Sequence, residues 1–210
     1  MKAKHYEGEY IPFDRREYTP MPMGEFIDKI MERDERDFNG IGLYSEDKSP
    51  MIRLNQHERF EELKRYLEGI TEEEFEDEPI QLNDARLSGL IAPELKVPYI
   101  QAMHSILDYG AINKGDISRG LFYGTQMRYF TAEESDATQG RLIKVNGYSS
   151  NWRNGVLNKA DPEGSSFRNA DFRETERNGF DVGAAEDITD ADFGGEEPEI
   201  LEIRNRGYLS

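Results

Sequence analysis

The 210-residue sequence contains no cysteine and only three histidines, and these scarcities exclude several kinds of site. Without thiols the chain cannot form disulfide bridges, thiolate zinc sites or a cysteine nucleophile. The histidines, His5, His57 and His104, are too scattered to form a paired metal-ligand motif. The sequence therefore predicts a protein that uses no metal.

Long apolar segments are also absent. No run of about 18 apolar residues occurs that could cross a membrane, and residues 1–20 lack the apolar stretch of a secretory signal peptide. We therefore expect no membrane partner and a cytoplasmic location. Aromatic residues are frequent, with 11 Tyr, 11 Phe and 1 Trp, which favours a folded core over a disordered acidic chain.

Negative charge is in large excess and is unevenly distributed. The 43 acidic and 26 basic residues give a net charge of −17. Residues 1–78 have a net charge of −10 and residues 161–210 of −9, whereas residues 79–160 have +2. Direct binding to nucleic acid is not expected, because an acidic protein repels phosphates at long range. The middle segment is the one that would tolerate an anionic ligand.

The densest acidic run extends from Glu72 to Glu78, where six of seven residues are acidic. Runs of this kind are typical of a solvated helix face or loop. Thr71, which precedes the run, and Glu74 match the capping box of a short helix. The sequence therefore predicts a helix here without assigning it a function.

Apolar spacing predicts three further helices. Apolar residues recur at helical intervals from Gly24 to Phe38, and again from Phe60 to Leu67, where Gly69 is placed to end the helix. A fourth helix is predicted from Pro98, a suitable first-turn proline, to Gly110. The first half of the chain is therefore expected to be mainly helical.

Short segments rich in β-branched and aromatic residues follow. They predict strands at Ile117–Tyr123, Arg141–Tyr148 and Glu199–Ile203. The stretch 158–195 is rich in Gly, Asp and Asn and is interpreted as mostly loop, and no internal repeat is recognised. Helices followed by strands predict an α+β fold.

The expected organisation has two parts. Residues 1–23, with Pro12, Pro20 and Pro22, form an extended arm. Residues 24–210 form a single domain. Its helical part spans 24–110 and its β-rich part spans 111–210.

Three features of the second half could carry chemistry. Arg119 stands between apolar residues of a predicted strand, so its charge needs a partner, either a structural carboxylate or a ligand. Ser149 and Ser150 precede Trp152 and could cap a helix or serve a site. Glu197 and Glu199 would lie on one face of a strand, a spacing common in catalytic sites that also arises by chance in an acidic chain.

Taken together, these features resemble mono-ADP-ribosyltransferases. Segment 105–121, with its Arg119-Gly-Leu, is similar to the helix, connector and first strand of that family. Segment 147–160 resembles the family's Ser-Thr-Ser strand and the following helix, with Tyr148 at the first serine position. The stretch from Glu197 to Leu201 is similar to the Glu-x-Glu that opens the last strand. The resemblance covers residues 98–210, and the short chain resembles phage-encoded transferases.

The resemblance implies a two-sheet β core around an NAD cleft, preceded by helices. It implies an enzyme that transfers ADP-ribose from NAD to an arginine of a host macromolecule, with a host protein as acceptor, and releases nicotinamide. Glu199 would stabilise the oxocarbenium-like transition state, and Glu197 would orient and deprotonate the acceptor.

The other site residues are also implied by the resemblance. Arg119 would bind the ribose-phosphate part of NAD, and Gly120 would leave room for its carboxamide. Ser149 and Ser150 would support the catalytic glutamate, and Phe193 would contact the acceptor. NAD, as a substrate, is the cofactor implied, and no metal is required.

Two other classes of function stay open. The charge of −17 fits an acidic decoy that mimics nucleic acid. The proline- and aromatic-rich residues 1–23 fit a non-catalytic phage virion or scaffold component.

Overall fold

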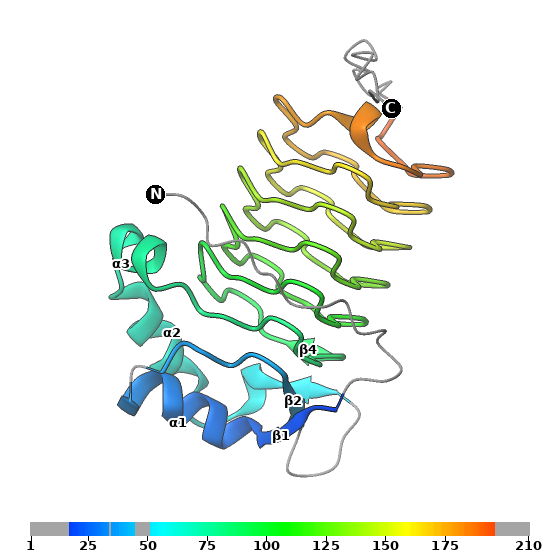
Figure 1. The fold of residues 1–210 in the computed structure, drawn as a ribbon. Helices are drawn as coiled ribbons and strands as arrows, with labels where there is room; N and C mark the ends of the chain where they lie inside the picture. Colours follow the sequence, from blue (N-terminus) through cyan, green and yellow to red (C-terminus); the bar gives the residue numbers. More distant parts are fainter. Residues whose placement is uncertain (1–16, 34, 45–50, 196–210) are drawn as a thin grey trace, which may run out of the picture.

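The computed structural model describes residues 17–33, 35–44 and 51–195, and the α-helices of these residues lie at the N-terminal end of the molecule (Figure 1). The α-helices of this part of the chain are α1 (Met23–Arg33), α2 (Phe60–Glu68) and α3 (Glu72–Asp77). All three were predicted, although α1 ends at Arg33 rather than at Phe38. Gly69 is the C-cap of α2, and Thr71 forms the predicted capping box with Glu74.

Helix α1 covers one end of the hydrophobic core. Its apolar face buries Phe26, Ile27 and Ile30. The Phe26 ring meets the ring of Phe38 edge-on, with centroids 4.7 Å apart. Such an end cap is needed because an open stack of coils would expose its apolar interior.

Short parallel strands begin the β structure. Strand β1 (Thr19–Pro22) pairs with β2 (Ile41–Tyr44), and β3 (Ile52–Arg53) pairs with β4 (Leu90–Ile91). A 3₁₀ turn, η2 (Leu54–Gln56), follows β3 and leads toward α2 and α3. The segment expected to be an extended arm, 1–23, thus contributes β1 to the folded part.

From Ile80 onward the chain winds into stacked coils. Parallel bridges join residues 20 positions apart, from Gln81 with Gln101 to Val156 with Glu176, and successive bridges start five residues further on. Each coil therefore has four sides of five residues, and the fold is a four-sided parallel β-helix. Figure 1 shows the coils rising from the helical end to the orange coil that ends near residue 195.

A tight turn at every corner makes the sides five residues long. Every fifth residue from Asp84 to Gly179 has a positive φ. Each side has a central residue, whose carbonyl accepts a hydrogen bond from the amide three residues further on. The Gly110 amide, for example, donates to the carbonyl of the central residue Leu107 at 3.0 Å. A positive φ at the third residue is the mark of type II turns. The backbone between corners is extended and hydrogen-bonds to the coils above and below.

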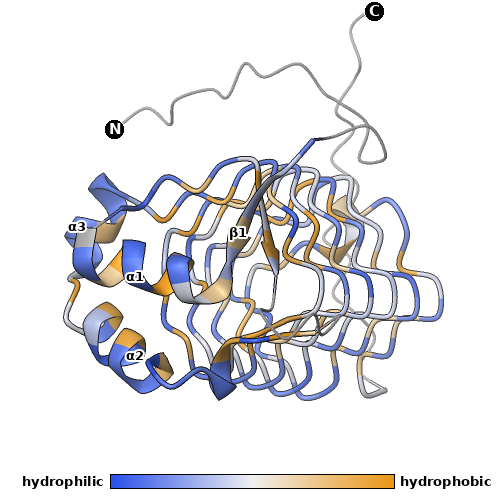
Figure 2. Ribbon diagram, turned by 90° about the horizontal axis from the view of Figure 1, so that it is seen from below, coloured by the Kyte–Doolittle hydropathy of each residue, from blue (hydrophilic) through white to orange (hydrophobic). Residues whose placement is uncertain are grey.

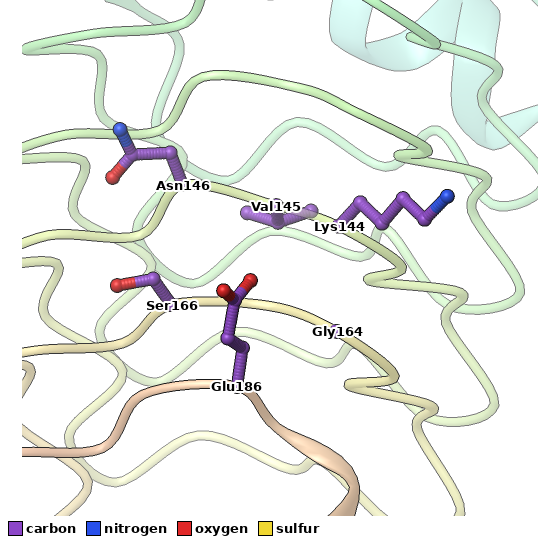
Figure 3. A pocket seen from close by; sticks show the side chains of 6 residues that line it. All are labelled: Lys144, Val145, Asn146, Gly164, Ser166 and Glu186. Carbon is purple, nitrogen blue, oxygen red and sulfur yellow. The ribbon is translucent and has the colours of Figure 1, made fainter.

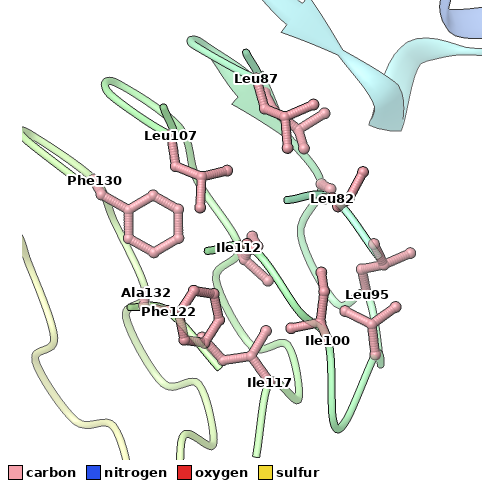
Figure 4. Packing of buried hydrophobic residues seen from close by; sticks show 14 of the residues in the cluster. Leu82, Leu87, Leu95, Ile100, Leu107, Ile112, Ile117, Phe122, Phe130 and Ala132 are labelled. Atoms are coloured by element: carbon pink, nitrogen blue, oxygen red, sulfur yellow. The ribbon is translucent and has the colours of Figure 1, made fainter. Parts of the chain in front are cut away.

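Two residues of each side point into the interior, and they make the core (Figure 4). Figure 2 shows that apolar residues recur at intervals along the stacked coils. The buried central residues are Leu82, Leu87, Ala92, Val97, Ala102, Leu107, Ile112, Ile117, Phe122, Met127, Ala132, Ala137, Leu142, Trp152, Leu157, Phe167 and Phe172. The residue two positions before each centre is also buried and is often Gly, Ala, Ser or Thr. The small residue makes space for a large centre, so the core is filled coil by coil.

The predicted α+β fold with a two-sheet NAD cleft is wrong. The segment expected to form a helix from Pro98 to Gly110 and those expected to form strands at Ile117–Tyr123 and Arg141–Tyr148 are sides and corners of the β-helix. Most of 158–195, interpreted as loop, belongs to the same coils. The internal repeat that the sequence analysis did not recognise has a period of five. The predicted strand Glu199–Ile203 lies outside the described residues.

Candidate functional site

Arg119 lies at a corner of the β-helix rather than inside a strand, with a φ of 56°. Its guanidinium Nη1 is 2.6 Å from a carboxylate oxygen of Glu72 in α3, and this hydrogen bond raises the pKa of Arg119. The guanidinium carbon is also 5.3 Å from the centroid of the Tyr99 ring. Glu76 accepts a hydrogen bond from the Tyr99 hydroxyl at 3.4 Å, and burial raises the pKa of that phenol. Arg119 and Tyr99 therefore dock α3 onto the coils.

We expect Arg119→Gln to loosen α3 while leaving the β-helix folded. Both side chains of the Arg119–Glu72 pair are more than a third exposed, so the loss of global stability should stay below about 1 kcal/mol. Hydrogen exchange of the α3 amides should accelerate, and high salt should produce a similar effect in the unsubstituted protein. Lys159→Gln, two coils further along the same corner, is the matched control. Unchanged exchange in α3 would show that the ion pair does not hold the helix.

The other cofactor residues of the prediction are part of the β-helix framework. Gly120 faces the interior, where a Cβ would lie 2.6 Å from the Phe122 ring. Ser149 forms a corner with a φ of 53°. The buried Ser150 hydroxyl donates to the carbonyl of Gly147 at 2.7 Å and accepts from the indole nitrogen of Trp152 at 2.9 Å. No helix begins at Trp152, so the predicted capping role of the serines does not apply.

The predicted site residues are not brought together in the described structure. Phe193 is 8% exposed and stacks on Phe172, with ring centroids 5.2 Å apart. It lies on a different side of the β-helix from Arg119, and Ser149 lies on a third side. The expected catalytic residues Glu197 and Glu199 fall outside the described residues.

One lateral surface carries features that the sequence analysis did not identify, and we call it the tyrosine face. It consists of residues 85–89, 105–109, 125–129, 145–149 and 165–169, which stack one above another. Tyr109 and Tyr129 are 57% and 46% exposed, and their rings stack with centroids 5.0 Å apart. The Tyr148 ring contacts Tyr129 edge-on at 5.6 Å. Three successive coils therefore present an aromatic ladder.

An ion pair between Asp108 and Arg128 lies next to the ladder. The Asp108 side chain is 5% exposed and accepts two hydrogen bonds from the Arg128 guanidinium, at 2.5 Å from Nη2 and 3.0 Å from Nε. It also accepts from the Arg128 amide at 2.8 Å. The hydrogen bond to Asp108 raises the pKa of Arg128. The pair locks neighbouring coils together next to Tyr109 and Tyr129.

The charge of the tyrosine face is opposite to that of the whole chain. Its basic residues are Arg86, Arg128 and Arg168, and all three are exposed. Its one carboxylate is that of Asp108, which is buried and paired. The 20-residue spacing of Tyr109 and Tyr129 predicts the ladder only once the length of a coil is known to be 20 residues.

Comparisons with known proteins found similarity to solved structures. No protein-family model and no curated protein matches the chain. Among solved structures, the chain is similar to Rfr23, a pentapeptide repeat protein from the cyanobacterium Cyanothece 51142, with 16% identity, a TM-score of 0.47 and coverage of 54% of this chain and 90% of that one. It is also similar to QnrB1, a plasmid-mediated fluoroquinolone resistance protein, with 13% identity, a TM-score of 0.39 and coverage of 76% and 75%.

A third similar structure is HetL, a pentapeptide repeat protein involved in heterocyst differentiation regulation from Nostoc sp. strain PCC 7120. Its identity is 15%, its TM-score is 0.18, and the match covers 73% of this chain and 54% of that one. The five-residue sides and 20-residue coils of the chain itself define its fold.

The predicted membership of the mono-ADP-ribosyltransferases, and the ADP-ribosyl transfer to a host arginine that it implied, are therefore wrong. The chain forms a β-helix with four sides of five residues per coil, which leaves no two-sheet core around an NAD cleft in the described residues. The resemblance had placed Arg119, Ser149 and Phe193 in one site, although these residues lie on different sides of the β-helix.

Within the described ranges there is no cluster of three potential metal-ligating side chains and no helix long and apolar enough to cross a membrane. NAD as cofactor, a host protein partner, little direct nucleic-acid binding and a cytoplasmic location stay predictions.

Proposed function

We propose that the protein is a non-catalytic binding module that holds another protein on its tyrosine face. The observation that carries this proposal is the ladder of Tyr109, Tyr129 and Tyr148, displayed by three successive coils. Tyrosine and arginine dominate the energetics of protein interfaces, because they bury much area and still offer hydrogen bonds. Exposed aromatic clusters of this kind are unusual on a surface without a partner.

The rigidity of the ladder favours tight binding. The Tyr109 and Tyr129 rings are nearly parallel, with an interplanar angle of 9°, and Tyr148 contacts the second ring. The adjacent Asp108–Arg128 pair links the two coils that carry the stacked rings. Side chains that are ordered before binding lose less entropy in a complex, so more of the contact energy is retained as affinity.

The charge of the face indicates the chemistry of the partner. Arg86 and Arg168 are exposed on this face and the charge of Arg128 is compensated by Asp108, so the face is slightly positive, whereas the chain as a whole has a net charge of −17. An acidic protein surface would complement these arginines, and a basic one would be repelled locally. The partner is therefore a protein whose contacting surface combines apolar side chains with carboxylates.

Site-specific photocrosslinking tests this proposal. A photoreactive phenylalanine analogue at position 129 should yield a discrete crosslinked partner from a lysate of the source cell, whereas the same group at Lys159, on the opposite side, should not. The purified partner should then bind the unsubstituted protein directly. Tyr129→Ala should weaken this binding about 30-fold, as expected for a central interface tyrosine, and Lys159→Ala should leave it unchanged.

Two outcomes would contradict the proposal. Equal crosslinking from positions 129 and 159 would mean that the capture is nonspecific. An unchanged dissociation constant for Tyr129→Ala would mean that the ladder is not the binding surface. Circular dichroism of the variant separates both from a folding defect, since removing one exposed ring pair should cost only about 1 kcal/mol.

A further inference from the structure

The last described coil contains one extra residue, and this irregularity forms a bulge. Asn146 bridges Ser166 at the usual spacing of 20, but Ser166 bridges Asp187, 21 positions later. The amides of Glu186 and Asp187 both donate to the carbonyl of Ser165, at 2.8 and 3.3 Å. Two residues thus oppose one, which is the definition of a β-bulge. The turn η3 (Val182–Ala184) lies in the same coil, capped by the Asp181 side chain.

The bulge is accompanied by a hollow on the surface. An open cavity of about 410 Å³ lies between the bulge and the two preceding coils (Figure 3). Its lining residues are Lys144, Val145, Asn146, Gly164, Ser166 and Glu186. Gly164 has a φ of +64° and no side chain, so the wall between Lys144 and the bulge stays low. Bulges re-aim side chains and are frequent next to functional sites.

The polar groups of this hollow favour a cation. The Glu186 carboxylate has no hydrogen bond or ion pair within the described part of the chain, and Figure 3 shows it pointing toward the coil above. The Ser166 hydroxyl lies on the adjacent coil, and Asn146 is held by its side-chain oxygen, which accepts from the Tyr148 amide at 3.3 Å. A carboxylate with neighbouring hydroxyl and amide groups offers acceptors to an N–H-rich ligand.

Lys144 does not neutralise this carboxylate. Its ammonium group donates to the Tyr123 hydroxyl at 3.0 Å and lies 5.2 Å from the centre of that ring. Figure 3 shows the charged end of Lys144 directed away from Glu186. The aliphatic part of Lys144 instead forms one apolar wall of the hollow.

We propose that this hollow is a binding site for a guanidinium group. A planar guanidinium can donate two parallel hydrogen bonds to the Glu186 carboxylate and further ones to Ser166 and Asn146. Its alkyl chain would lie along the aliphatic part of Lys144. The group can come from an arginine of a protein or from a small free guanidine. The site lies at the edge of the tyrosine face, but it does not depend on the partner proposed above.

Binding of small guanidines, followed by NMR of the ¹⁵N-labelled protein, tests the site. Acetyl-arginine methylamide, which imitates an arginine within a protein, and agmatine, a free guanidine, are titrated separately. We expect shifts of the Asn146, Ser166 and Glu186 amides with a dissociation constant of about 1 mM, because the site is open to water. The neutral isostere acetyl-citrulline methylamide should not bind. Tighter binding of the arginine derivative than of agmatine supports a protein source, and the reverse supports a free guanidine.

Substitution of the carboxylate is the decisive step. Glu186→Gln should weaken binding about tenfold, the usual effect of losing a charged hydrogen-bond partner. Glu133→Gln, on another side of the β-helix, should leave binding unchanged. Equal binding to Glu186→Gln, equal binding of citrulline, or shifts located elsewhere would overturn the proposal. None of these results would bear on the Tyr129 crosslinking experiment, so the two proposals fail separately.

Discussion

Replacing Trp152 with alanine is expected to lower the free energy of unfolding by about 3–5 kcal/mol, the largest effect of a single substitution considered. The indole is 1% exposed and fills the interior beside the Phe130 ring, whose centroid is 6.1 Å away. Its N–H is satisfied by Ser150 at 2.9 Å. Alanine would leave a cavity that the stacked coils cannot close, because their spacing is set by backbone hydrogen bonds. Denaturant titration followed by far-ultraviolet circular dichroism measures the loss.

Trp152→Phe is the matched control. It retains most of the buried area but loses the hydrogen bond to Ser150, so we expect a loss of about 1–2 kcal/mol. Coils on both sides of Trp152 should exchange their amides faster in the alanine variant, because each coil is stabilised by its neighbours. A loss below about 1 kcal/mol for Trp152→Ala would show that the interior is not packed around this ring.

Gly120→Ala is expected to destabilise the β-helix by about 1–3 kcal/mol, although it adds a single methyl group. The new Cβ would lie 2.6 Å from the Phe122 ring and 2.8 Å from the carbonyl oxygen of Ile117. Both distances are shorter than van der Waals contact, and the carbonyl belongs to the hydrogen-bonded turn. Two coils further on, Ala160 occupies the same column, where the central residue of the side is Pro162 rather than phenylalanine.

A double substitution tests whether Phe122 is the cause. Phe122→Leu should make room for the added methyl group, so the Gly120→Ala/Phe122→Leu variant should be less destabilised than the two single losses added together. The four proteins of this cycle can be compared by denaturant titration. Strict additivity would mean that the Ile117 carbonyl, not the ring, meets the new methyl group. A neutral Gly120→Ala would contradict the close packing altogether.

The helices could be predicted from the sequence because their determinants are local. The capping box of Thr71 and Glu74 acts within α3. Gly69 ends α2, and its amide donates hydrogen bonds to the backbone carbonyls of Arg65 and Tyr66. The apolar stripe of α1 also lies within one segment. Such patterns need no knowledge of distant residues.

The β-helix was missed because its period is carried by residue size and position rather than by identity. The inward positions accept Gly, Ala, Ser and Thr as readily as Leu and Phe. Gly147, Pro162 and Arg177 further interrupt the run of apolar central residues, each on a different side of the β-helix. A five-residue period fits neither a helix of 3.6 residues per turn nor an alternating strand, so parts of it imitate both. The segment from Pro98 to Gly110 was accordingly interpreted as a helix.

The candidate surfaces depended even more on the tertiary structure. Tyr109 and Tyr129 are unremarkable in the sequence and become a stack only because one coil spans 20 residues. Glu186 lines one hollow with Asn146 and Ser166 only because successive coils stack these distant residues, and the coil of Glu186 is longer by a residue. Conversely, Arg119 and Ser149 belong to consecutive motifs of the resemblance described above, but they lie on different sides of the β-helix.

The sequence by itself therefore determined the three helices, their ends and the excess of negative charge, because capping, amphipathic spacing and composition act within a segment or do not depend on position at all. Only the tertiary structure decided the β-helix, the tyrosine face and the hollow at Glu186. The backbone of a five-residue side forms its hydrogen bonds with residues of the neighbouring coils, 19 or 21 positions away. The Ala102 amide donates to the carbonyl of Leu121, and the Gln101 amide donates to that of Ile80. Contacts at that separation form only when the coils stack, and no local preference encodes them.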